Sequence, residues 1–222
     1  MKPILKAQNL SKTYKTPLDV TVLEGISLEV FPGETIAIVG KSGEGKTTLL
    51  HLLGTLEKPT TGTIEICGEI ATPQKSPLLR NAHIGFVFQA YHLLEECTVL
   101  ENVLMPARIG KEDIKPGSPV YQRALELLDE VGLSHRALFP TKLLSGGEKQ
   151  RAAIARALIN DPSIILADEP SGNLDHAHSQ AIYTLLLEEA QKRNKALVVV
   201  THDLSLASQC KKTYSLQDGK LL

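Results

Sequence analysis

Short apolar runs alternate with longer amphipathic segments along most of the chain. Four continuous apolar runs predict strands buried on both faces, and these are residues 84–88 and 163–167, Thr35–Val39 and Ala196–Thr201. Helical spacing of apolar residues predicts three helices, in residues 46–54, residues 147–160 and His176–Lys192. This alternation of strand and helix predicts an α/β protein whose sheet is mostly parallel and covered on both faces.

Two regions depart from this alternation. Before the turn signal Pro32-Gly33, apolar positions in residues 4–8 and 21–31 predict short strands. Residues 95–144 contain one clear amphipathic helix, at 121–131, and no strand candidate. We interpret this second region as a helical subdomain inserted into the sheet.

Composition and charge narrow the class of protein. Of 222 residues, 42% are hydrophobic and 22% charged, which is enough apolar mass for a real core. The net charge of −1 argues against a nucleic-acid partner, because duplex binding usually needs a basic surplus. No apolar stretch approaches the roughly 20 residues that cross a bilayer, and the three widely spaced cysteines suggest no disulfide framework. We therefore expect a soluble protein of the reducing cytosol.

Residues 40–47 (GKSGEGKT) fit the pattern G-x-x-x-x-G-K-[ST] between a predicted strand and a predicted helix. Glycines allow successive N–H groups to turn inward around phosphate oxygens, and the helix start adds the positive end of its dipole. Lys46 would meet the β- and γ-phosphates, and the Thr47 hydroxyl would bind Mg²⁺. The alternative is a glycine-rich turn that matches by chance. The predicted nucleotide contacts here are Gly40, Lys41, Ser42, Gly43, Glu44, Gly45, Lys46, Thr47 and Thr48.

Glu44 is an unusual residue for this loop, because it brings a carboxylate to a site for anions. We expect its side chain to point to solvent, since the backbone forms the cradle. A misdirected carboxylate would cost about 1.4 kcal/mol per phosphate charge, which is about tenfold in affinity.

Two acids, Asp168 and Glu169, follow the apolar run at 163–167. An acid just beyond a buried strand lies at the carboxyl edge of the sheet, where phosphate loops also lie. Asp168 would therefore hold Mg²⁺, and Glu169 would orient or deprotonate the attacking water. Without the phosphate loop upstream, the pair would instead be interpreted as solvated acids opening a turn before Pro170.

A second helix start has the residues of an anion site, because Ser145, Gly146 and Gly147 precede the predicted helix. Simple capping is the alternative. One nucleotide on one chain has no use for two such sites, whereas two chains facing each other could share them. The segment 144–150 (LSGGEKQ), in which Ser145 precedes Asp168 by 23 residues, closely resembles the signature sequence of ATP-binding-cassette (ABC) ATPases.

This resemblance covers essentially the whole chain and implies a fold, a substrate and a metal. It implies that residues 1–222 form a single ABC ATPase domain of the P-loop NTPase type. The domain would have a mostly parallel central sheet, an N-terminal antiparallel β subdomain, a helical subdomain at about 95–160 and a RecA-like core in the remainder. It also implies hydrolysis of ATP with Mg²⁺ by a homodimer that encloses two ATP molecules between its chains.

The same resemblance implies roles for four further residues. Tyr14 matches the aromatic residue that stacks on adenine, and Gln89 matches the glutamine that senses Mg²⁺. His202 matches the histidine that contacts the γ-phosphate, and Asp175 ends the segment 171–175 that communicates across the dimer. Taken singly, Tyr14 could be an ordinary strand-end tyrosine and His202 a satisfied polar residue.

Finer similarities suggest a physiological role. The segments that look like the ATPases of lipoprotein-releasing systems are residues 49–54, 85–89, 92–94, 100–103 with 105–106, and 172–175. Macrolide-efflux-type and cell-division cassettes have much of the same sequence in these segments and remain alternatives. A non-transport ABC ATPase is less favoured, because the chain has no long coiled coil and a single ATPase unit. The resemblance implies membrane subunits that bind residues 89–103 at the cytoplasmic face of the bacterial inner membrane.

Overall fold

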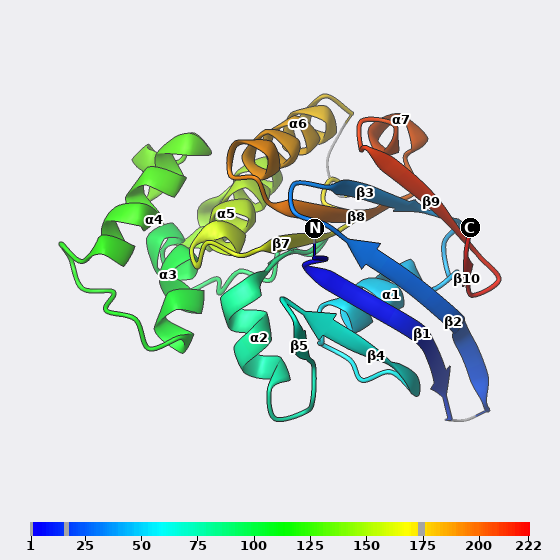
Figure 1. Ribbon diagram of the computed structural model, residues 1–222. Coiled ribbons are helices and arrows are strands. Elements are labelled where there is room, and N and C mark those ends of the chain that lie inside the picture. Colours follow the sequence, from blue (N-terminus) through cyan, green and yellow to red (C-terminus); the bar gives the residue numbers. More distant parts are fainter. Residues whose placement is uncertain (1, 16–17, 173–175) are drawn as a thin grey trace.

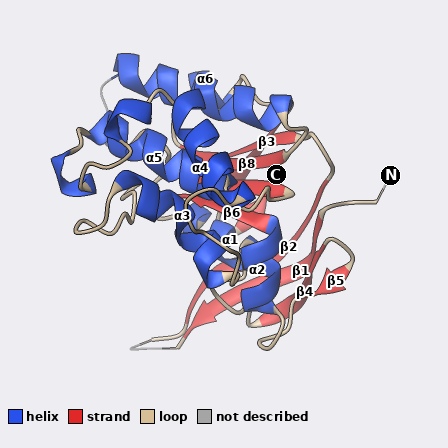
Figure 2. Ribbon diagram, turned by 90° about the vertical axis from the view of Figure 1, so that its left-hand side faces the viewer, coloured by secondary structure: helices blue, strands red, loops and turns tan. Residues whose placement is uncertain are grey.

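The computed structural model describes residues 2–15, 18–172 and 176–222, and the side chains of all of these except 176–178. Its strands form two sheets with helices between and outside them (Figures 1 and 2). The first sheet is antiparallel, in the order β2-β1-β4-β5. Its strands are β1 (Leu5–Tyr14), β2 (Val20–Val30), β4 (Thr61–Ile66) and β5 (Glu69–Ile70).

The second sheet follows the order β10-β9-β3-β8-β7-β6, and of its described pairs only that of β10 with β9 is antiparallel. Its strands are β3 (Thr35–Val39), β6 (Ile84–Val87), β7 (Ile164–Asp168), β8 (Ala196–Thr201), β9 (Lys212–Gln217) and β10 (Lys220–Leu221). The predicted α/β class, with a mostly parallel sheet and an antiparallel N-terminal sheet, is therefore confirmed.

Helix α1 (Lys46–Leu53) lies between the two sheets, whereas α5 (Gly146–Leu158) and α6 (His176–Lys192) cover the other face of the parallel sheet (Figure 1). The core follows this division. Alternate residues of β7 go to opposite sides: Leu166 packs in the cluster that contains α1 and the antiparallel sheet, and Ala167 in the cluster that contains α5 and α6. Continuous burial of β7 is thus the consequence of helices on both faces.

Helices α3 (Val99–Ile109) and α4 (Pro119–Glu130) pack against each other and against α5. The predicted helix at 121–131 is α4, while α3 was not predicted. Helix α5 contacts both α3 and β6, so the proposed limits of a helical subdomain at about 95–160 stay a prediction. Two short 3₁₀ turns, Ser134–Arg136 and Thr141–Leu143, lead into α5.

Other elements differ from the sequence-based expectation in extent or were missed. Strand β1 continues to Tyr14 instead of ending at residue 8, because irregular pairings with β2 let it pass a polar stretch. The missed elements are β4, β5, β9, β10, α2 (Ser76–His83), α3 and α7 (Leu204–Ala207). Among the described helices, none is long and apolar enough to cross a bilayer.

The parallel register aligns the ends of the strands that carry the predicted site. Val39 pairs with Thr201, and Asp168 pairs with Val200, so these three strands finish at one edge. Asp168 ends β7 at that edge, and the phosphate loop, Glu169 and His202 follow directly beyond it.

Candidate nucleotide-binding site

The loop between β3 and α1 requires glycine at several positions. Gly43 and Gly45 have φ values of 86° and 93°, which side chains with a Cβ rarely adopt. A Cβ at Gly45 would lie 2.6 Å from Val22 Cγ1, and one at Gly40 would lie 2.6 Å from the carbonyl oxygen of Leu216. The loop is therefore wedged against β2 and β9, and its path is fixed before any ligand arrives.

Helix α1 begins in a way that suits an anion. Its N-cap is Gly45, no side chain caps it in the described structure, and its first turn contains no acid. The first backbone N–H groups of a helix have no intrahelical partner, and they carry the positive end of the helix dipole. These N–H groups are consequently available to donate hydrogen bonds to a phosphate.

Lys46 lies folded onto the loop. Its ammonium donates to the carbonyl oxygens of Gly40, at 2.8 Å, and of Lys41, at 2.9 Å, and the residue is only 8% exposed. The charge is thus held where the predicted β- and γ-phosphates would meet it.

The expectation that the Glu44 side chain points to solvent is wrong. Its Oε2 atom is buried without a hydrogen-bond partner in the described structure, and it lies 3.0 Å from the Cβ position of Gly40. The reason is a turn in which the Glu44 N–H faces the Lys41 carbonyl oxygen at 3.4 Å, so that residue 44 folds back over the start of the loop. A carboxylate oxygen of Glu44 therefore lies buried beside Gly40, at the start of the phosphate loop.

The two residues predicted to hold Mg²⁺ from α1 and β7 are in contact. The Thr47 hydroxyl donates to Asp168 Oδ1 at 3.1 Å. Burial raises the pKa of the Asp168 carboxyl, while the Thr47 hydrogen bond acts to lower it. Carboxylate and hydroxyl oxygens are the ligands that Mg²⁺ prefers, so the residues present fit this ion.

Glu169 and His202 meet at the ends of β7 and β8. Glu169 Oε2 and His202 Nδ1 are 2.9 Å apart, and the histidine ring is 72% exposed whereas the carboxylate is 16% exposed. Glu169 has a φ of 42° and donates its N–H to the Val200 carbonyl oxygen at 3.0 Å. An unusual backbone conformation thus aims the carboxylate at the histidine.

Gln89 reaches the same region from the end of β6. Its Nε2 atom would be 2.7 Å from a Cβ at Gly172, so the Gln89 amide packs closely against this residue. The Gly172 N–H in turn donates to the Glu169 carbonyl oxygen at 2.9 Å. Gln89 therefore lies against the turn that follows Glu169.

Tyr14 is the last residue of β1 and is partly exposed. Its hydroxyl donates to Glu57 Oε2 at 2.8 Å, and the Lys12 ammonium lies 4.9 Å from its ring centre. Burial and the Glu57 hydrogen bond raise the pKa of Tyr14, and Thr48 in the first turn of α1 acts in the other direction. Sequence reasoning missed Glu57, because nothing local marks a contact between residues 43 positions apart, and it also gave no role to Lys12.

Ser145 caps α5 through a capping box. Its hydroxyl accepts from the Glu148 N–H at 3.3 Å, and its own N–H donates to the Glu148 carboxylate at 2.8 Å. Arg136 pairs with the same carboxylate at 3.1 Å. Helix α5 packs in the core cluster on the opposite side of the parallel sheet from α1, and no described hydrogen bond joins Ser145, Gly146 or Gly147 to the phosphate loop of the same chain. Asp175 lies outside the described residues.

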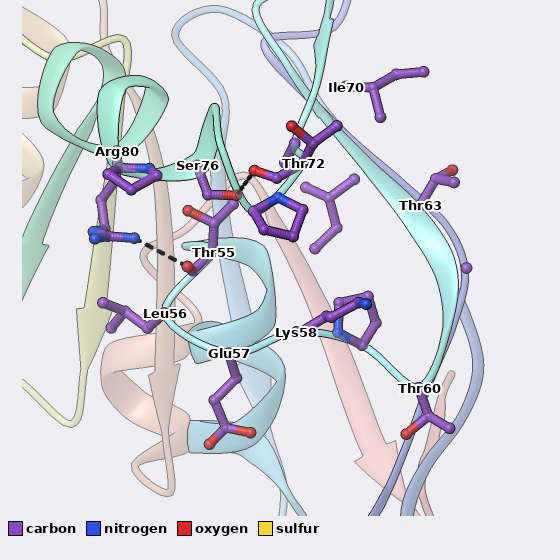
Figure 3. A pocket seen from close by; sticks show the side chains of 16 residues that line it. Thr55, Leu56, Glu57, Lys58, Thr60, Thr63, Ile70, Thr72, Ser76 and Arg80 are labelled. Atoms are coloured by element: carbon purple, nitrogen blue, oxygen red, sulfur yellow. Dashed lines mark hydrogen bonds between the residues drawn. The ribbon is translucent and has the colours of Figure 1, made fainter.

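A pocket of about 430 Å³ opens elsewhere, between the α1–β4 connection, β4, β5 and the start of α2 (Figure 3). Arg80 donates to the Thr55 carbonyl oxygen at 3.0 Å across its wall. None of the predicted site residues is among the described residues that line it. This pocket therefore does not mark the predicted nucleotide site.

Comparison with known proteins settles the family. A family model described as ABC transporter matches residues 23–172. The chain belongs to the ABC transporter family. It is an ATP-binding cassette with ATPase activity, as the resemblance implied.

Relatives match this cassette along its whole length. A lipoprotein-releasing system ATP-binding protein LolD of Protochlamydia amoebophila is 53% identical, covering 98% of this chain and 96% of the relative. The protein of the same description from Pseudomonas syringae pv. tomato is 48% identical, covering 100% of this chain and 98% of the length of that relative. That of Cytophaga hutchinsonii is 46% identical over the full length of both.

Solved structures agree with the fold. A dimeric structure of MJ0796, a bacterial ABC transporter cassette, has a TM-score of 0.89 and 38% identity, covering 98% of this chain and 96% of that one. A post-hydrolysis dimer of MJ0796 with bound ADP and Pi has the same TM-score, 37% identity and the same coverage. The structure of cbiO1 from Clostridium perfringens, part of the ABC transporter complex cbiONQ, has a TM-score of 0.86 and 28% identity, covering 100% of this chain and 88% of that one.

We expect Lys46→Ala to reduce ATP turnover at least about 100-fold, because a preorganised charge at the transferring phosphate is lost. Phosphate release under saturating Mg-ATP measures this. The control is Lys220→Ala, which removes an exposed ammonium whose nearest acid is 3.6 Å away and should retain turnover. Near-normal hydrolysis by Lys46→Ala would contradict the assignment of the phosphate loop.

Asp168→Asn should separate stability from metal binding. Burial raises the pKa of Asp168 in the folded state. At pH values above the ordinary aspartate pKa, the charged carboxylate therefore lowers the free energy of unfolding, and this penalty disappears once the carboxyl is protonated. The ligand-free variant should therefore unfold at an equal or higher temperature near neutral pH, with the advantage vanishing below about pH 4. Thermal scans with ATP should also show that adding Mg²⁺ no longer stabilises the variant. A variant that keeps the full Mg²⁺ effect would refute the metal role.

Proposed function

We propose that this cassette hydrolyses ATP to power the release of lipoproteins from the bacterial inner membrane. The observation that carries the proposal is its full-length similarity, at 46–53% identity, to ATP-binding proteins of lipoprotein-releasing systems from three distant bacteria. The cassette would act at the cytoplasmic face, held there by integral membrane subunits. Its net charge of −1 gives no support to a nucleic-acid partner.

Each described site residue has a task that its geometry supports. Lys46 meets the β- and γ-phosphates, and the open N–H groups of α1 surround the phosphate oxygens. Thr47, Asp168 and Gln89 would hold Mg²⁺, which neutralises charge on the transferring phosphate when bound. Tyr14 would stack on adenine beside Thr48.

Glu169 is the residue that we assign to the attacking water. Its carboxylate lies at the sheet edge beside His202. There it would accept a proton from the attacking water or orient that water by a hydrogen bond. His202 fixes Glu169 through the 2.9 Å contact and has an exposed ring free to contact the γ-phosphate. The two side chains act as a unit, because each orients the other.

The proposed active form contains two chains. No described hydrogen bond or ion pair joins the segment Ser145-Gly146-Gly147 to the phosphate loop of the same chain, so a second copy would be needed to bring a signature segment over each nucleotide. Asp175 would communicate between the copies. ATP favours this closed form only through contacts that ADP lacks, which are those made to the γ-phosphate.

A groove of about 430 Å³ between α2, α3, α5 and the loop after β6 is the proposed seat of a membrane subunit. Its wall includes Phe86, Phe88, His92, Met105, Pro106 and Arg156. Of the predicted contact surface at 89–103, His92 lines the groove, whereas Val99 and Leu100 are buried in the core. Among the described lining residues none is acidic and two are arginines, which suits a partner helix with apolar and acidic side chains.

Glu169→Gln should trap the ATP-bound dimer. The amide cannot take a proton from water, so turnover should fall at least about 100-fold while the nucleotide contacts persist. Size exclusion with Mg-ATP should then show a dimer. The matched control combines Glu169→Gln with Lys46→Ala and should stay monomeric. If Glu169→Gln alone elutes only as a monomer at saturating Mg-ATP, the two-chain proposal fails.

Purification of the tagged cassette from detergent-solubilised membranes of cells with its own membrane subunits tests the physiological role. We expect a partner with four transmembrane helices and a large periplasmic domain. Met105→Lys should abolish this co-purification by adding a cation to an arginine-lined groove, whereas Ile70→Lys, on the rim of the neighbouring pocket, should retain it. Recovery of a six-helix importer subunit with a solute-binding protein would contradict lipoprotein release.

A further inference from the structure

The loop after β6 contains a strained turn. Tyr91 and His92 have φ values of 59° and 48°, so two successive residues with a Cβ adopt the left-handed region. The His92 N–H donates to the Ala90 carbonyl oxygen at 2.6 Å, and the ring of Phe88 packs edge-on against that of His92 at 4.9 Å. Such a conformation persists only where the surrounding structure holds it.

Arg156 on α5 supplies that hold. Its two terminal nitrogens donate to the carbonyl oxygens of Tyr91, at 2.7 Å, and His92, at 2.5 Å. The planar guanidinium presents parallel N–H groups, so it clamps two successive carbonyls in one orientation. A lysine can reach a carbonyl there but cannot reproduce the fork.

The charge on Arg156 is otherwise uncompensated. In the part of the chain that the structure describes, no carboxylate forms an ion pair with it. Burial lowers the pKa of Arg156 to about 10, so it remains charged at neutral pH. Partial burial of a cation that bonds only to carbonyl oxygens costs desolvation free energy. We therefore infer that the conformation of this loop serves function and not only the stability of the fold.

Gln89 is the residue that depends on this loop. It lies two positions before Tyr91, and its amide lies against Gly172 in the turn that follows Glu169. We therefore expect the position of the backbone at 91–92 to affect where the Gln89 side chain lies relative to Glu169. Asn102 holds the end of the loop near Leu94 and Thr98 through hydrogen bonds with these two residues. Arg156 holds the other end, at Tyr91 and His92.

We propose that Arg156 is a positioning residue that holds Gln89 at the Mg²⁺ and γ-phosphate site by clamping the Tyr91-His92 turn to α5. This rests on the role proposed above for Gln89. Arg156 and His92 also line the groove proposed for the membrane subunit, and α5 begins at the signature segment. One guanidinium thus connects the groove, the loop and the signature helix.

The test is a double-mutant cycle between Arg156→Gln and Gln89→Ala in the full chain. Outer-shell partners of a metal site typically change metal affinity or activity 10–100-fold. We expect Arg156→Gln to lower kcat about tenfold and to raise several-fold the Mg²⁺ concentration for half-maximal turnover. In the Gln89→Ala background the same substitution should change kcat less than about twofold, because the two residues act through one path.

Three further measurements separate positioning from folding. The Kd for ATP without Mg²⁺ should stay within about twofold in Arg156→Gln, because the guanidinium does not touch the phosphate loop. Arg156→Lys should recover part of the lost kcat. The matched control is Arg123→Gln, which removes an arginine bond of 3.1 Å to the Ile159 carbonyl oxygen near the end of α5, and should leave kcat unchanged.

Each contrary result overturns a distinct statement. If Gln89→Ala does not alter kcat or the Mg²⁺ dependence, the role of Gln89 fails and the positioning proposal falls with it. If Gln89→Ala has its effect but Arg156→Gln has none, the proposal for Arg156 alone is wrong. A loss of ATP affinity and thermal stability that matches the loss of kcat would likewise overturn it, because it would show a purely structural role.

Discussion

The parallel pairing of β3, β8, β7 and β6 is the constraint on which the site depends. Each strand delivers one functional segment beyond the same edge: the phosphate loop, His202, the two acids and Gln89. Because side chains alternate between faces, a shift of one residue would turn every core side chain to the wrong face. Helices on both faces bury β7 and β8 completely, so the packing that stabilises the sheet also fixes the positions of the reacting groups.

The side chains of the site are already held in place by hydrogen bonds within the chain, and bound ATP would replace some of these hydrogen bonds with its own. Lys46 rests on two loop carbonyls, and Asp168 rests on Thr47, so each is oriented before a ligand arrives. Oriented groups lose little freedom on binding, and burial strengthens their electrostatic effect. The buried oxygen of Glu44 opposes this arrangement, because it adds negative charge beside Gly40.

Sequence patterns predicted the parts of the structure that depend on local composition. Continuous apolar runs located the buried strands of the central sheet, and the motifs located the residues beyond them. Strand β4 and helices α2 and α3 were missed, because Thr61–Ile66 has few apolar residues and α3 contains Pro106. Contacts between distant residues left no local signal: Arg156 meets Tyr91 across 65 positions, and the Glu44 carboxylate turns inward through the loop's own turn.

The two proposed phosphate-contacting helix starts differ in strength, which gives a physical reason for ATP to act as the link between chains. Helix α1 begins with open N–H groups, whereas α5 begins with a capping box whose Glu148 carboxylate already occupies its first turn. The hydrogen bond from the Ser145 N–H lowers the pKa of Glu148, so this carboxylate is charged, and Arg136 offsets part of that charge. An anion therefore favours the phosphate loop, and the signature segment adds useful binding only to a nucleotide already held by another chain. In the proposed dimer, closure then depends on the phosphate loop being filled first.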